Sequence, residues 1–151
     1  MRVQQLRSVL EHVTESRLEM HKLYLRLYHF ADGTRVKLLL NYLQSEELAK
    51  SQAIAAYIDT SAKRTLDTWF ENVRFESIHI ACDKVYLPAD MTTDQVMDLH
   101  LTLDAEVMSV LDKILNLAIN NDVRSALSSI VSTAKVKRQR LMHNLTRMED
   151  M

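Results

Sequence analysis

The sequence predicts an all-α fold: a four-helix bundle of two antiparallel helical hairpins joined by a long crossover that contains a short helix. The 151 residues include only one glycine and one proline, too few turn formers for an all-β chain. Apolar residues recur at three- and four-residue spacing through four long segments, which is the period of an amphipathic helix. Two breaks between these segments are short, so we expect antiparallel neighbours within a single domain, residues 1–151.

The first hairpin is expected over about residues 3–59. Its first helix should end at Asp32-Gly33, where the only glycine suits the left-handed residue that often closes a helix. The second helix should begin at Thr34. In its inward row Glu47 and Lys50 interrupt an otherwise apolar set. The inward row of the first helix is Leu6, Val9, Val13, Met20, Leu23, Leu27 and Phe30. That of the second helix is Val36, Leu40, Leu43, Glu47, Lys50, Ile54 and Tyr57.

The second hairpin is expected over about residues 93–148. Residues 92–94 (Thr-Thr-Asp) offer caps for its first helix, and residues 120–122 (Asn-Asn-Asp) break the chain before its second. Each inward row of this hairpin contains one charged residue, Glu106 in the first and Lys137 in the second. The rows are Val96, Leu99, Leu103, Glu106, Val110, Ile114 and Leu117, and then Val123, Leu127, Ile130, Ala134, Lys137, Leu141 and Leu145.

The crossover, about residues 60–91, is long for a compact domain. Leu66, Trp69, Phe70 and Val73 predict a short helix inside it, whereas residues 73–86 fit a helix or an extended chain equally well. The crossover has more large apolar residues than a loop usually exposes. We expect most to cover the bundle and a minority to form a surface for a second copy or a partner protein. The residues assigned to that surface are Trp69, Phe70, Phe75 and Tyr86.

Composition excludes several classes of partner. The formal net charge is −1, which gives no support for binding to nucleic acid or a membrane surface. No apolar run is long enough to cross a bilayer, and the N-terminus leads into an amphipathic stretch rather than a signal peptide. Cys82 is the only cysteine, so no internal disulfide can form. We therefore expect a cytoplasmic protein.

The two hairpins match one another at an offset of 87 residues. Apolar positions coincide at several points, for example Val36 with Val123 and Leu40 with Leu127, as two amphipathic hairpins of one length would allow. The polar matches are more informative, because Glu19 falls on Glu106 and Lys50 falls on Lys137 near mid-helix.

On these residues, and on the segment from Asp32 to Glu47, the chain resembles the ferritin-like superfamily, and its rubrerythrin-type branch most of all. That family's di-iron site takes a Glu from each of two helices and a Glu-x-x-His from each of the others. The resemblance implies that Glu19 and Glu106 match the single glutamates and that Glu47 matches the first paired one. Lys50 and Lys137 stand in place of both histidines, and Ala134 in place of the last glutamate.

Lysine at neutral pH is charged and offers no lone pair to a metal. The resemblance therefore implies a degenerate di-iron site with no cofactor, in which buried ion pairs replace the metals among Glu19, Glu47, Lys50, Glu106 and Lys137. We expect a non-enzymatic bundle that acts through protein contacts, as a homodimer or with another protein. Two alternatives stay open: a residual iron or manganese oxidoreductase, and a binder of a small anionic ligand inside the bundle.

Other sequence patterns give little support for a metal site or for catalysis. His100-x-x-x-Asp104 has a helical metal-ligand spacing, but no further histidine matches it on another helix, so we expect an ordinary surface histidine. One glycine rules out a glycine-rich phosphate loop, and no Ser-His-Asp or Cys-His arrangement can be identified. The sequence thus predicts no catalytic residues.

Overall fold

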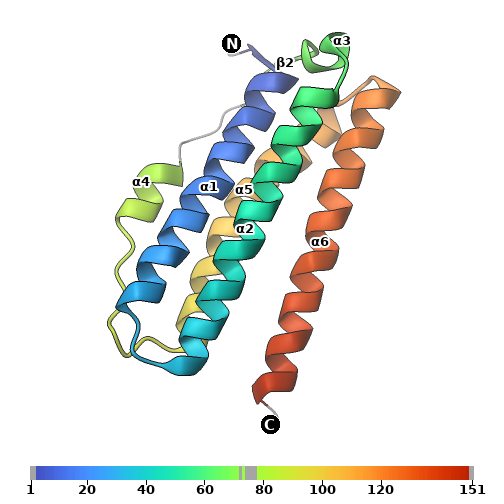
Figure 1. Ribbon diagram of the computed structural model, residues 1–151. Helices are drawn as coiled ribbons and strands as arrows, with labels where there is room; N and C mark the ends of the chain where they lie inside the picture. Colours follow the sequence, from blue (N-terminus) through green and yellow to red (C-terminus); the bar gives the residue numbers. More distant parts are fainter. Residues whose placement is uncertain (1–2, 72, 74–77, 150–151) are drawn as a thin grey trace. The chain divides into compact units, whose positions relative to one another are not determined.

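The computed structural model describes residues 3–71, 73 and 78–149 (Figure 1). Within them the predicted all-α class is confirmed, with four long helices and two short ones. None of these helices has an apolar stretch that could cross a membrane. The chain forms two compact units that divide after Val110. The long helices are α1 (Leu6–Phe30), α2 (Thr34–Thr60), α5 (Thr93–Leu117) and α6 (Asn121–Glu149).

Helices α1 and α2 form the expected first hairpin. The turn between them differs from the prediction. Gly33 has φ −78° and ψ 134°, so it is the extended N-cap of α2 and not a left-handed residue that closes α1. Helix α1 ends at Phe30, and Ala31 is its C-cap, whose N–H donates to the carbonyl of Leu27. The N–H of Asp32 donates to the carbonyl of Ala89. The connection after α4 therefore closes this end of α1.

The crossover contains three short elements: α3 (Lys63–Leu66), β2 (Trp69–Glu71) and α4 (Ile78–Asp83). The short helix predicted through Trp69 and Phe70 is wrong, because these residues form β2, which pairs antiparallel with β1 (Val3–Gln5). Strand geometry points alternate side chains to opposite faces, so Phe70 is buried and Trp69 is exposed. Both strands have three residues, too few for an alternating pattern to be recognised.

The predicted starts of α5 and α6 are both confirmed by their caps. Thr92 precedes α5, its hydroxyl accepts the N–H of Gln95 at 3.1 Å, and its own N–H donates to the Gln95 side chain at 3.0 Å. Asn120 precedes α6, and its side-chain oxygen accepts the N–H of Asp122 at 2.8 Å. Helix α6, in the second unit, buries Val123, Leu127, Val131 and Leu141.

Candidate functional site

Arg17 lies at the centre of a buried polar cluster in the first unit. Its Nη1 atom donates to Glu47 Oε2 of α2 at 3.1 Å and to Asp104 Oδ1 of α5 at 2.7 Å. The arginine is 1% exposed, so the guanidinium and both carboxylates are shielded from solvent. Nη2 lies 3.7 Å from the sulfur of Met108, a weak acceptor. Charge-assisted hydrogen bonds of this length are among the strong ones, so one side chain ties three helices together.

The cluster contains a second cation. Lys50 Nζ donates to Glu47 Oε1 at 3.1 Å, so the two oxygens of Glu47 bind two different cations. Two carboxylates thus face two cations. The ionic charges of the cluster balance without any further ion.

A hydrogen-bonded pair of neutral groups completes the cluster. The hydroxyl of Tyr24 lies 2.8 Å from His100 Nδ1, and both side chains are buried. Burial lowers the pKa of His100 to about 4, although Glu47 and Asp104 oppose this shift. Burial also raises the pKa of the Tyr24 phenol well above its usual value. Imidazole and phenol are therefore neutral near pH 7. We call the whole set the core polar cluster: Arg17, Tyr24, Glu47, Lys50, His100 and Asp104.

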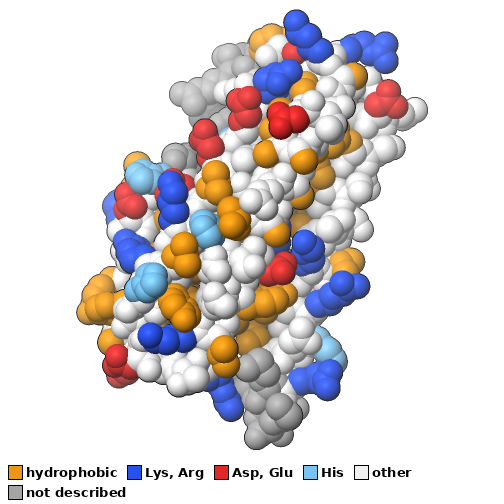
Figure 2. All heavy atoms as spheres, in the orientation of Figure 1, with side chains coloured by type: hydrophobic (Ala, Val, Ile, Leu, Met, Phe, Trp, Pro, Cys, Tyr) orange, Lys and Arg blue, Asp and Glu red, His pale blue; other side chains and the backbone are white. Residues whose placement is uncertain are grey.

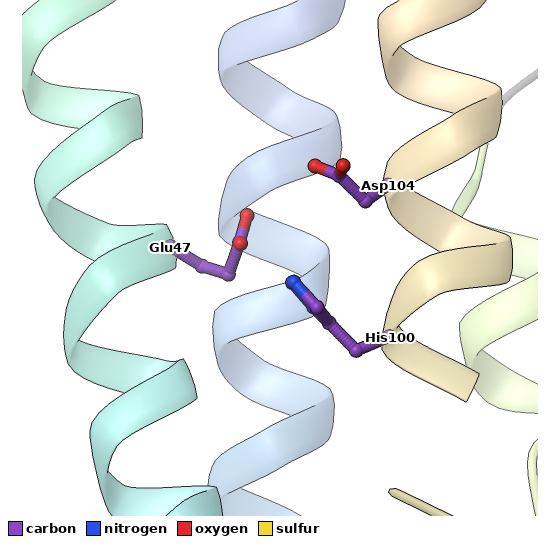
Figure 3. Close-up of side chains that lie close together, drawn as sticks. All are labelled: Glu47, His100 and Asp104. Atoms are coloured by element: carbon purple, nitrogen blue, oxygen red, sulfur yellow. The ribbon is translucent and has the colours of Figure 1, made fainter. Parts of the chain in front are cut away.

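Three members of this cluster are also potential metal ligands. Figure 3 shows the side chains of Glu47, from α2, and of His100 and Asp104, from α5, pointing toward one another. One ligand atom from each lies within 4.8 Å of the others. Among the residues that the structure describes, these three form the group of potential metal ligands whose atoms come this close to one another.

Comparison with known proteins gives a fold and no more. No family model matches the sequence, and no curated protein matches it. A solved structure does match: a "putative ferritin-like diiron-carboxylate protein" from Thermotoga maritima, with a TM-score of 0.68 over 95% of each chain.

The chain has the ferritin-like fold. Sequence identity to the Thermotoga protein is only 14%, so the similarity concerns architecture and leaves activity open.

The residues present do not fit the di-iron site of ferritin-like proteins. Such a site needs carboxylates from four helices and two histidines at Glu-x-x-His spacing. Here Glu47 is followed at that spacing by Lys50, which donates to Glu47 and cannot ligate a cation. Arg17 binds the same carboxylate and Asp104 as well. Two ferrous ions would place four positive charges beside these two cations. The cluster therefore has neither the ligand types nor the net negative charge that a di-iron site requires.

Of the five residues predicted to form the buried cluster, the structure brings Glu47 and Lys50 together. Glu106 is exposed, so its predicted burial is wrong. Glu19 is partly exposed and binds His79 at 2.9 Å and Lys22 at 3.6 Å, and the bond to His79 lowers its pKa. Lys137 is half-buried in the second unit.

The physical reason for the error is a register shift of two residues. Glu19 and Glu106 each follow a buried residue, Arg17 and Asp104, by two positions, which is about 200° around a helix axis at 3.6 residues per turn. The 87-residue offset between the hairpins does relate two residues that are in contact, because Arg17 and Asp104 are 87 positions apart in the sequence and are hydrogen-bonded.

Sequence reasoning missed Arg17, and it recognised the metal-ligand spacing of His100 and Asp104 but set it aside because no histidine on another helix matched. The expectation of a surface histidine is wrong, because His100 is 2% exposed. A signal was present for Arg17, which fills the gap at helical spacing between Val13 and Met20 in the inward row of α1. Arginine was not expected at a core position, since charged residues are rarely buried unless paired.

The residues predicted for a partner surface divide into three groups. Trp69 and Tyr86 are 61% and 77% exposed, so both are accessible on this chain. Phe70 is 3% exposed and packs inside, so it is not part of an accessible surface. Phe75 lies outside the described residues.

Proposed function

We propose that this ferritin-like protein is not an enzyme and acts through protein contacts, with an arginine serving as the cation of its core. The observation that carries the proposal is the position of Arg17 Nη1, between Glu47 and Asp104. Burial lowers the pKa of Arg17, but Glu47 and Asp104 together outweigh it and raise this pKa above the ordinary value. The guanidinium therefore stays charged at any physiological pH and cannot make way for a metal by losing a proton.

Charge balance explains why the cluster needs no metal. A divalent cation bound by Glu47, His100 and Asp104 would share a buried space with Arg17 and Lys50, which already neutralise the carboxylates. Binding would require Arg17 to leave its carboxylates and to find a new solvated position. Separating a buried ion pair typically costs about 3–5 kcal/mol, which opposes metal binding.

The proposed contacts use exposed apolar residues near both ends of α1, because Trp69 pairs with Gln5 just before this helix and Tyr86 lies beside Phe30 at its end. Trp69 and Tyr86 are accessible, and so are Leu38 and Ile80, which are each 60% exposed. Large apolar side chains in water favour burial against a partner. A homodimer in the cytoplasm is the simplest assembly, and the buried lone Cys82 fits a reducing compartment.

A second candidate function is binding of a single iron or manganese ion, with residual redox activity. The observation that favours it is the convergence of Glu47, His100 and Asp104. Neutral imidazole and carboxylates are competent ligands for such ions. This function requires Arg17 to move out of the cluster.

The test is metal content together with oligomeric state. Protein purified without chelators or a histidine tag is incubated anaerobically with ferrous iron, desalted and examined by elemental analysis and oxygen uptake. We expect substoichiometric iron and no oxygen uptake, with a dimer in sedimentation velocity. Stoichiometric iron that is lost in Glu47→Gln, with oxygen uptake, would establish the second function. A metal-free monomer would refute the homodimer and direct attention to a different partner protein.

A further inference from the structure

A surface pocket of about 400 Å³ lies where the last turns of α1 meet the connection after α4. This volume is in the range of sites that hold small molecules. Figure 2 shows exposed hydrophobic side chains in this region, with basic, histidine and acidic side chains around them. Five apolar residues form most of the lining: Leu27, Phe30, Val85, Tyr86 and Leu87.

Two aromatic rings dominate the pocket and remain open to water. Phe30 is 49% exposed and Tyr86 is 77% exposed, and their ring centroids are 6.4 Å apart at an interplanar angle of 56°. Their apolar area would leave water if an aliphatic chain lay against both rings. That transfer is favourable for every methylene buried.

The walls are held in place by hydrogen bonds that do not depend on a ligand. Arg26 Nη2 donates to the carbonyls of Cys82 and Val85 at 3.0 and 3.3 Å. The N–H of Asp32 donates to the carbonyl of Ala89 at 2.8 Å. These bonds attach the start of the connection to α1 and its later part to the turn that follows α1. A preformed pocket loses little conformational entropy when it binds.

The polar side chains that line the pocket favour an anion. Arg26 and His29 complete the lining, and no acidic side chain belongs to it among the described residues. The C-terminal end of α1 opposes an anion, but a helix terminus carries only about half a charge, less than the guanidinium of Arg26. We propose that this pocket binds a small amphipathic carboxylate. Its aliphatic chain lies against Phe30 and Tyr86, and its carboxylate pairs with Arg26.

The first experiment is calorimetric titration of the full chain with octanoate, below the concentration at which it forms micelles. We expect saturable binding of one octanoate per chain. Hexanoate should bind about 15-fold more weakly, because each buried methylene contributes about fourfold to the binding constant. Octylammonium, with the same chain and the opposite charge, should not bind measurably. Non-saturable heat, or equal binding of octanoate and octylammonium, would overturn the proposal.

Matched variants locate the site. Tyr86→Ala should weaken octanoate binding about tenfold or more, because an exposed ring contributes contact area without supporting the core. Trp69→Ala removes another exposed aromatic residue, in β2, and should leave binding unchanged. Thermal melts of both variants confirm folding. Equal affinity of wild type and Tyr86→Ala would place any binding elsewhere and refute the assignment. This test is independent of the metal question, because neither Tyr86 nor Trp69 belongs to the core polar cluster.

Discussion

Replacing Arg17 by methionine leaves one cation for two buried carboxylates. The substitution removes the 2.7 Å contact to Asp104 and the 3.1 Å contact to Glu47, while Lys50 still contacts Glu47. Breaking a buried pair by removing one partner typically costs about 3–5 kcal/mol, and we expect a loss of this size in the free energy of unfolding. Asp104→Asn should also destabilise, because it leaves the buried guanidinium without one of its anions.

The double variant Arg17→Met/Asp104→Asn restores the balance of charge. We expect it to be about 2–3 kcal/mol more stable than the sum of the single effects predicts. Urea unfolding followed by circular dichroism measures all four proteins of the cycle. The exposed pair of Glu19 and Lys22 provides a control cycle, with expected coupling below about 0.5 kcal/mol. Additive effects of Arg17→Met and Asp104→Asn would refute the view of the cluster as a balanced ionic unit.

Four further predictions concern separate features of the chain. Burial lowers the pKa of His100 from 6.5 to about 4. Protonation therefore favours the unfolded chain, so the protein should lose about 3 kcal/mol of stability as the pH falls from 6.5 toward 4. His100→Asn should flatten urea-derived stability over this window, and an unchanged slope would contradict the shift. Gly33→Ser should stabilise the folded protein by about 0.5–1 kcal/mol, because serine is a good N-cap residue and restricts the unfolded chain. The site accepts it, since φ of Gly33 is negative and an added Cβ would lie at an ordinary 3.7 Å from Val36. Phe70→Ala should cost about 3–5 kcal/mol and Trp69→Ala less than about 0.5, so similar losses in urea unfolding would disprove the assigned strand faces. Burial raises the pKa of the Cys82 thiol to about 11, so native protein should react with a disulfide reagent about 100-fold more slowly than unfolded protein at pH 8. Equal rates would show an accessible thiol.

The long helices could be predicted because their signal is repeated many times. Each inward row offers seven positions at or near helical spacing. The caps at Thr92 and Asn120 come from residue types whose side chains bond the first free N–H groups of a helix. The strand pair could not be predicted, because its ladder joins segments more than sixty residues apart with three residues each. The extended Gly33 follows Asp32, whose N–H bonds to the carbonyl of Ala89, a contact between distant segments that local sequence does not encode.

The candidate site was predicted in part. Glu47 and Lys50 were found because charged residues interrupt an apolar row and share a helix face. The pairing of Arg17 with Asp104 was missed because a buried charge becomes plausible only when its partner on another helix is known. The burial of His100 likewise depends on its tertiary partner Tyr24. Helical periodicity specifies which face points inward, but not which polar residues meet there.

Titration with cobalt(II), followed by its visible absorption, tests the central claim most directly. If the guanidinium of Arg17 occupies the place of a metal, wild-type protein will show no absorption from bound cobalt. Arg17→Gln should then gain a saturable site that is lost again when Asp104→Asn is added, because the three potential ligands converge in the fold. Stoichiometric cobalt binding by wild-type protein, abolished by His100→Asn, would contradict the claim and identify the core as a metal centre.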